Sequence, residues 1–294
     1  MHPDSHHNMP EWGRRTYVMG VINVTPDSFS GDGLVAAGDP ADVFERVAQQ
    51  AAHFAETGAD MLDIGGESTR PGSVPVSAGE ELARVIPAIE AARAAAPGII
   101  ITIDTYRAEV AAAALDAGAD WVNDVWGLRM DPAMAGLVAE RGCPVIIMHN
   151  RSKPKDVNQE ARLGGRYIGV HYDDLLGDIR AELTAQAGIA LAAGVRPDRI
   201  ILDPGIGFGK TVEQNLELID RLGEIKTLGY PVLLGPSRKS FIGYALDLPP
   251  DQRLEGTAAA TAIGIDRGAD IVRVHDVAMM ARIARMTDAI VRHV

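Results

Sequence analysis

Polar and ionisable side chains stand at the ends of eight short apolar runs in the sequence. These positions are Asn23, Asp63, Asp104, Asn123 with Asp124, His149, Asp203, Ser237, and Arg273 with His275. Capping of a loop would explain any one of them. Eight together favour a polar ligand site, because a purely structural fold has little use for so many convergent polar groups.

The candidate residues divide into two chemical types. Cations and donors that suit a phosphate are Arg70, Lys210, Arg238, Lys239, Arg273 and His275. Arginine binds such an anion through two parallel hydrogen bonds, whereas lysine acts as a point charge. Asp104, Asn123 and Asp203 supply carboxylate and amide groups that can pair with a nitrogen heterocycle. The residues therefore indicate a ligand with an anionic part and a flat polar ring.

Patterns for other ligands are weak or missing in the sequence. The segment GIGFGK at 205–210 lacks the spacing of a nucleotide-binding P-loop. The sequence has neither paired cysteines nor the His-Glu-x-x-His pattern that would indicate a zinc site. A Mg²⁺ ion would need only a few protein oxygens beside a substrate diphosphate, and Asn23 offers one.

The apolar runs read as β-strands that alternate with helices. Gly-Ala-Asp precedes three of them, at 58–60, 118–120 and 268–270, as expected where a helix ends at glycine and a strand begins. Asp39-Pro40 predicts a helix start, and Ser77 with Glu80 predicts a capping box for a helix to about Ala96. Eight such units predict the α/β class, as a single (β/α)8 TIM barrel of parallel strands. The long polar segment 150–172 predicts an extended loop after strand five.

Composition limits the other possibilities. The chain has 294 residues, of which 47% are hydrophobic, enough for one large domain. Its net charge of −12 gives no support for nucleic-acid or membrane-surface binding. No apolar run approaches the ~20 residues that span a bilayer, and the single Cys143 fits a reducing compartment. We expect a cytoplasmic protein with a disordered segment at 1–14 and a barrel domain at 15–294.

At these residues the chain closely resembles the dihydropteroate synthase family of pterin-binding barrels. The matching motifs lie in the family's order from about Tyr17 onward: NVTPDSFS at 23–30, DIGGESTRPG at 63–72, IDTY at 103–106, NDV at 123–125, MH at 148–149, ILDPGIGFGKT at 201–211, SRKSFIG at 237–243, GT at 256–257 and RVHDV at 273–277. The family, the target of sulfonamides, joins 6-hydroxymethyl-7,8-dihydropterin diphosphate to para-aminobenzoate in folate synthesis and releases pyrophosphate. The resemblance also implies Mg²⁺ as cofactor and a homodimer.

The resemblance assigns roles to residues of this chain. It implies that Asp104, Asn123, Asp203 and Lys239 hold the pterin ring, and that Asn23, Arg273 and His275 hold the diphosphate, with Mg²⁺ at Asn23. The implied aminobenzoate pocket and closing loops comprise Thr25, Pro26, Asp27, Ser28, Phe29, Thr69, Arg70, Pro71, Phe208 and Ser237. Asp203, Lys239, Arg273 and His275 would be the catalytic residues.

An SN1-like reaction is the expected mechanism, because an electron-rich dihydropterin can stabilise the cation left when diphosphate departs. Two alternatives stay open: a non-catalytic paralogue that binds pterins, and a methyltetrahydrofolate-type methyltransferase on a related barrel. Neither explains the SRKS and RVH segments as well, since both segments lie on the diphosphate side. The chain departs from the family's usual residues at Gly31, Asn150 and Pro236, none of which carries an assigned role.

Overall fold

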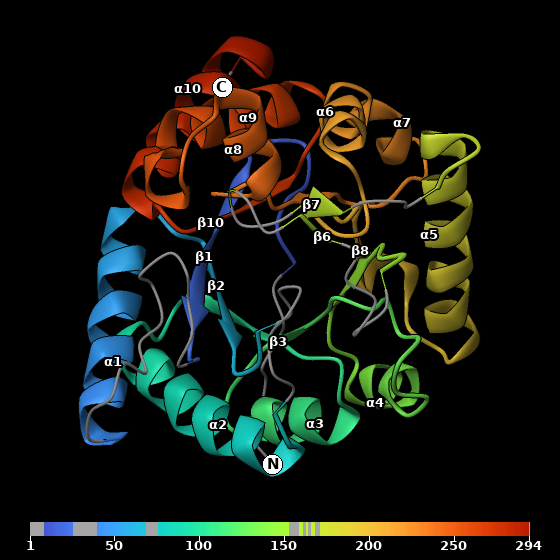
Figure 1. Cartoon of the computed structure of the whole chain (residues 1–294). Coiled ribbons are helices and arrows are strands. Elements are labelled where there is room, and N and C mark those ends of the chain that lie inside the picture. Colours follow the sequence, from blue (N-terminus) through green and yellow to red (C-terminus); the bar gives the residue numbers. More distant parts are fainter. Residues whose placement is uncertain are drawn as a thin grey trace.

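The computed structural model describes residues 9–25, 40–68, 76–152, 159–160, 163, 166–167 and 171–293. Eight parallel strands form a barrel within them, surrounded by helices (Figure 1), which confirms the predicted class. The strands are β1 (Tyr17–Asn23), β2 (Met61–Gly65), β3 (Ile100–Asp104), β4 (Trp121–Asp124), β5 (Val145–Met148), β8 (Ile200–Asp203), β9 (Leu233–Leu234) and β10 (Ile271–Val274). Their order is β8-β5-β4-β3-β2-β1-β10-β9, and a parallel bridge between Leu202 and Val232 joins the two ends.

Helices follow the strands around the barrel. They are α1 (Pro40–Thr57), α2 (Ala78–Ala95), α3 (Ala108–Asp116), α4 (Met134–Arg141), α5 (Leu175–Ala192), α6 (Val212–Asp220), α7 (Leu222–Lys226), α8 (Ser240–Leu246), α9 (Leu254–Asp266) and α10 (Val277–Val291), with short 3-10 turns at Pro197–Arg199 and Pro250–Gln252. The predicted capping box of α2 is present: Ser77 Oγ accepts from Glu80 N at 3.2 Å, and Glu80 Oε2 accepts from Ser77 N at 2.8 Å. The glycines that precede β2, β4 and β10 have left-handed backbones, with φ of 110° at Gly58, 111° at Gly118 and 103° at Gly268, as the Gly-Ala-Asp pattern predicts.

The barrel interior has an apolar lower layer. It consists of fully buried side chains from seven strands: Met19, Met61, Trp121, Ile146, Ile201, Leu233 and Ile271. Alternate residues of a strand face the same side, so the residues two positions later point into the barrel one layer higher. In four strands that next residue is polar, namely Asp63, Asn123, Asp203 and Arg273. The strand pattern itself thus builds a polar layer at the carboxyl end, where barrels carry their chemistry.

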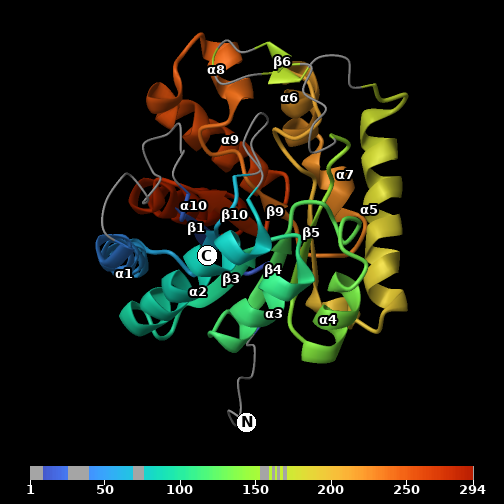
Figure 2. The same cartoon turned by 60° about the horizontal axis from the view of Figure 1, so that its bottom comes forward.

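Two expectations about the chain's loops and terminus need adjustment. The extended loop after β5 contains a small antiparallel pair, β6 (Gln159–Glu160) and β7 (Arg166–Tyr167). Figure 2 shows β6 at the same end of the barrel as α8. In the segment predicted to be disordered, Met9 and Trp12 pack against the lower interior layer, so the folded part begins before residue 15. Among the described residues, no helix is long and apolar enough to cross a membrane.

Candidate active site at the strand ends

The centre of the polar layer is a cluster of polar and charged side chains from four strands. Asp63, fully buried on β2, accepts hydrogen bonds from Thr102 Oγ1 at 2.7 Å and from Asn123 Nδ2 at 3.2 Å. Arg273 of β10 lies between two carboxylates, with Nε 2.5 Å from Asp63 Oδ2 and Nη2 3.0 Å from Asp104 Oδ2. This arrangement holds Asn123 and Arg273 in place inside the barrel, because each is fixed by the same buried carboxylate.

Asp104, at the end of β3, has one oxygen free for a ligand. Its Oδ1 is buried and has no hydrogen-bond partner among the described residues. Burial and the neighbouring Asp63 carboxylate raise the pKa of Asp104 to about 8, while Arg273 opposes that rise. A buried acceptor without a partner is costly unless a donor arrives. The site therefore favours a ligand that presents an N–H group to Asp104.

A second carboxylate stands across the barrel at the end of β8. Asp203 is 7% exposed, its Oδ1 accepts from Gly205 N at 2.7 Å, and burial raises its pKa. Lys239, which immediately precedes α8, donates to Ile206 O at 2.7 Å and lies 4.0 Å from the centre of the Phe208 ring. The glycine-rich segment after β8 thus brings a carboxylate, an ammonium and an aromatic face together.

Apolar side chains form the wall beside these groups. Val125, Trp126 and Met148 make a separate buried cluster at the ends of β4 and β5, with Tyr106 and Phe208 packed against it. Flat apolar surfaces next to a few directed polar groups are typical of sites for planar heterocycles. The wall includes Phe208, whose ring the Lys239 ammonium contacts, and Val125 and Trp126, which follow Asn123 closely in the chain.

The segment before α8 places Ser237 and His275 in contact. His275 Nδ1 lies 2.9 Å from Ser237 Oγ, which also accepts from His275 N at 3.1 Å. Between Ser237 and Lys239, Arg238 has a left-handed backbone with φ of 55°, and its guanidinium makes two hydrogen bonds to Asp276. The strained turn directs the two flanking side chains toward the site while Arg238 itself is occupied by an ion pair.

Arg253, which immediately precedes α9, stabilises the turn at Arg238. The side chain is 2% exposed and donates to Arg238 O at 3.0 Å, to Leu248 O at 3.1 Å and to Leu163 O at 2.8 Å. An Arg253→Met variant should lower the free energy of unfolding by at least about 2 kcal/mol, because three carbonyls lose their donor. Urea denaturation measures this.

The matched control for that prediction is Arg221→Met, which removes an exposed arginine paired with Glu217 and Glu224 on one helical stretch. It should leave the free energy of unfolding nearly unchanged. Equal effects of the two variants would contradict the assignment of Arg253.

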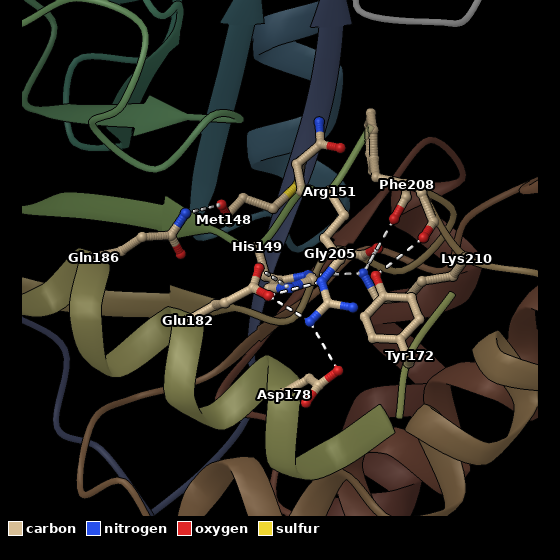
Figure 3. A network of polar contacts seen from close by, with 12 residues as sticks. Met148, His149, Arg151, Tyr172, Asp178, Glu182, Gln186, Gly205, Phe208 and Lys210 are labelled. Atoms are coloured by element: carbon tan, nitrogen blue, oxygen red, sulfur yellow. Dashed lines mark hydrogen bonds and ion pairs between the residues drawn. The ribbon is translucent and has the colours of Figure 1, made fainter. Parts of the chain in front are cut away.

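Lys210 does not join the phosphate-binding cations with which the sequence groups it. Its side chain is 2% exposed, and Nζ contacts Gly205 O at 3.0 Å, Phe208 O at 3.1 Å and His149 Nδ1 at 3.1 Å (Figure 3). Burial lowers the pKa of Lys210 to about 7. Burial and the neighbouring Lys210 ammonium lower the pKa of His149 to about 4. A sequence shows that a lysine follows a glycine loop, but the partners of its ammonium depend on the fold.

The remaining predicted residues are placed as follows. Asn23 ends β1 opposite Gly65 of β2, and Thr25, 5% exposed, lies two residues further. Pro26, Asp27, Ser28, Phe29, Thr69, Arg70 and Pro71 lie outside the described residues. The role of Asp63 as the central acceptor was not predicted. The sequence placed Asp63 among the polar strand ends, as a charged residue in the apolar run Met61–Gly65, but did not indicate its partners.

No group of three or more His, Cys, Asp or Glu side chains that could hold a metal is found in the described part of the chain. Asp63 and Asp104 are both paired with Arg273, and at the end of β1 the partly buried Asn23 offers an amide oxygen. This donor set fits Mg²⁺ bound mainly through substrate oxygens and water, as that ion prefers, rather than in an all-protein cage.

Comparison with known proteins identifies the class to which this barrel belongs. A family model described as "Pterin binding enzyme" matches residues 19–275. The barrel and its strand-end site are thus those of a pterin binding enzyme.

The relatives narrow this class. Dihydropteroate synthase from Bacillus subtilis is 47% identical over 94% of this chain and 88% of its own, and the one from Synechocystis is 48% identical over 96% and 92%. The structure of the Clostridium difficile dihydropteroate synthase in the presence of pteroic acid has a TM-score of 0.85 and 48% identity, covering 97% of this chain and all of that one. This chain belongs to the dihydropteroate synthase family.

Proposed function

We propose that the strand-end site condenses 6-hydroxymethyl-7,8-dihydropterin diphosphate with para-aminobenzoate to give 7,8-dihydropteroate and pyrophosphate, a transferase reaction of folate biosynthesis. The observation that supports the proposal is the set of contacts at the strand ends, where Arg273 binds Asp104, and where Asp203 and Lys239 bind the glycine-rich segment whose Phe208 packs in the apolar wall. Among related structures, the Xanthomonas albilineans enzyme has been solved with 4-aminobenzoic acid and with 7,8-dihydropteroate, and the Yersinia pestis enzyme with a sulfonamide drug.

The pterin ring is proposed to bind in the interior polar layer. Its N–H donors would meet the partnerless Oδ1 of Asp104 and the carboxylate of Asp203, and the Asn123 amide offers both a donor and an acceptor. Lys239 and Phe208 would lie on the same side of the ring, since the ammonium and the aromatic face are adjacent. A ring bound in this way is oriented by groups that are already fixed before it arrives, which lowers the entropic cost of binding.

The reacting carbon would lie between Asp203 on one side and Arg273 with His275 on the other. As its bond to the diphosphate breaks, negative charge grows on the leaving group, where Arg273 and His275 are proposed to stabilise it. Bound Mg²⁺, held at Asn23, would supply further charge neutralisation for the diphosphate. Asp203 stabilises the cationic pterin electrostatically, and the aromatic amine then attacks the methylene carbon and loses a proton. Ser237 and Phe208 are proposed to line the aminobenzoate pocket.

The activity is tested by measuring pyrophosphate release from the pterin diphosphate, with and without para-aminobenzoate and Mg²⁺, and by following the product by mass. Release coupled to formation of 7,8-dihydropteroate supports the proposal. Binding of the pterin without release would instead identify a non-catalytic paralogue. Methyl transfer from methyltetrahydrofolate to a corrinoid protein, without any pyrophosphate release, would identify a methyltransferase.

We also propose that the protein is a cytoplasmic homodimer with a single barrel domain. Several large apolar side chains are exposed on two helices in contact, Ile263 on α9 and Met279, Met286 and Ile290 on α10, as expected for a surface that another subunit covers. Light scattering coupled to gel filtration tests the oligomeric state.

The protonation of Asp104 gives a pH-dependent prediction. With a pKa of about 8, this carboxyl is mostly protonated at neutral pH, whereas a ligand N–H needs the carboxylate form. The affinity for 6-hydroxymethyl-7,8-dihydropterin should therefore rise from pH 6 to about 8, by up to about tenfold per unit, with release of a proton on binding. Calorimetry in two buffers of different ionisation enthalpy measures both quantities.

The control for this prediction is Asp104→Asn, which should bind the pterin more weakly and with a much smaller pH dependence in this range. The pterin without its diphosphate is the right ligand, because its use removes the titration of phosphate oxygens. An affinity of the unaltered protein that is the same at pH 6 and pH 8 would contradict the role of Asp104.

A further inference from the structure

Lys210 is a buried lysine whose ammonium is fully used by the protein. The three acceptors around Nζ are Gly205 O, Phe208 O and His149 Nδ1, at 3.0, 3.1 and 3.1 Å (Figure 3). An ammonium group has three N–H donors and accepts nothing. Each donor therefore has one partner, and two of the partners are carbonyls of the glycine-rich segment after β8.

His149 is oriented to accept from Lys210. On its other side, His149 Nε2 lies 3.0 Å from Glu182 Oε2 of α5, so the proton resides on Nε2 and Nδ1 has a lone pair for the lysine. Arg151 extends the network, with Nε 2.7 Å from Glu182 Oε1 and Nη2 2.8 Å from Asp178 Oδ2. The network thus connects Lys210 to the end of β5 and to α5.

The glycine-rich segment is pressed against the end of β5. Gly205, Gly207 and Gly209 all have left-handed backbones, and a Cβ on Gly205 would lie 1.9 Å from His149 O. This close approach fixes the path of the chain and turns the carbonyls of Gly205 and Phe208 toward Lys210. Without a donor there, two buried carbonyls would converge without partners, which is unfavourable.

The same short segment carries groups proposed to contact the substrates. The Gly205 amide donates to Asp203 Oδ1 at 2.7 Å, and Lys239 donates to Ile206 O at 2.7 Å from the substrate side. Phe208 supplies the ring beneath the Lys239 ammonium. Two lysines therefore hold one segment, Lys239 next to the substrates and Lys210 behind it.

We propose that Lys210 is a positioning residue for this reaction. Through the carbonyls of Gly205 and Phe208 it fixes the Asp203 carboxylate and the Phe208 ring for the pterin and the aminobenzoate, and His149 with Glu182 orients its ammonium. The inference rests on the proposed function and goes beyond it, because Lys210 touches neither substrate.

The test is a Lys210→Met variant, which keeps the length of the side chain and removes its donors. We expect kcat to fall and the KM for para-aminobenzoate to rise, so that kcat/KM drops about 10- to 100-fold, since a displacement of about 1 Å at a reacting centre costs that much. The Kd for the pterin diphosphate, measured by calorimetry, should rise at least about fivefold. Both measurements are made well below the melting temperature of each variant.

Arg93→Met is the matched control. Arg93 also holds backbone carbonyls of loops, with Nη2 2.9 Å from Gly118 O and Nη1 2.7 Å from Ile99 O, but these loops lie at the opposite end of the barrel. It should lower stability and leave kcat and KM within about twofold. A Lys210→Met variant whose kcat, KM and Kd also stay within that range would overturn the proposal.

Two further comparisons make the experiment decisive. If Lys210→Met does not fold, Lys210→Gln keeps two N–H donors without the charge, and its kcat/KM should still fall about fivefold or more. If the unaltered protein binds the pterin diphosphate but forms no product, the proposed activity fails. The Kd comparison then still decides the role of Lys210, since an unchanged Kd overturns it and a weaker one supports it.

Discussion

An Arg273→Met variant should lose both turnover and stability. Arg273 is the cation between Asp63 and Asp104, so the substitution leaves the buried Asp63 carboxylate beside Asp104 without its cation. Breaking a buried pair in this way costs about 3–5 kcal/mol, and loss of the cation at the leaving group should lower kcat by about 10²- to 10³-fold. Urea denaturation and steady-state kinetics measure the two effects.

The stability loss of this variant has a predicted pH dependence. Arg273 holds down the pKa of Asp104, so in its absence that pKa rises further above about 8. A carboxyl whose folded-state pKa is raised stabilises the fold at low pH, and this contribution is lost as pH rises through that pKa. Asp104 of the unaltered protein is itself protonated below about pH 8, so the two proteins differ in protonation above that value, and the defect of Arg273→Met should be smaller at pH 7.5 than at pH 9.5.

Arg292→Met is the control, because Arg292 pairs with the buried Asp288 near the start of β1, away from the strand ends. It should lower stability while kcat stays close to that of the unaltered protein. A loss of turnover in Arg273→Met no larger than in this control would contradict the proposed role at the diphosphate.

An Asp203→Asn variant should lose turnover without losing stability. The asparagine oxygen can still accept from Gly205 N, so the local structure persists, but the negative charge beside the cationic pterin disappears. Removing one such electrostatic group typically lowers kcat about 10²- to 10³-fold. Burial raises the pKa of Asp203, which means that the fold disfavours its charge, so the melting temperature should stay the same or rise.

Asp270→Asn gives the opposite pattern and serves as its control. Asp270 is a buried carboxylate at the other end of the barrel, where it accepts from Val232 N at 2.8 Å and pairs with Lys226. Its replacement should lower the melting temperature and leave kcat unchanged. If the turnover of Asp203→Asn is close to that of the unaltered protein, the proposed electrostatic stabilisation of the cationic pterin by Asp203 is contradicted.

The barrel could be predicted from the sequence because its signals are local. Glycine before a strand, a capping box at Ser77 and the alternation that places Asp63 above Met61 all act within a few residues. Polar strand ends follow from the same alternation, so the positions of Asn123 and Asp203 could also be predicted from the sequence. By contrast, β6 and β7 are only two residues long, too short to produce a pattern within a polar segment.

The partners of these side chains could not be predicted, because they depend on how distant strands align. Arg273 meets Asp63 across 210 positions of sequence, and Lys210 meets His149 across 61. Barrel closure sets the relative height of the strands, and no residue type encodes that height. The sequence thus indicated that Lys210 matters but assigned it to phosphate, whereas packing against the end of β5 places it behind the site.

The closure of the barrel has a consequence for its internal motions. Within the described residues its ends meet through the bridge between Leu202 and Val232, where Leu202 N donates to Pro231 O at 2.9 Å while Val232 N donates to the Asp270 side chain. Local opening of a fold follows the boundary with the fewest hydrogen bonds, and amide hydrogen exchange detects it. Deuterium should enter this boundary before the other strand pairs, so one edge of the strand that ends in Asp203 becomes exposed when the boundary opens.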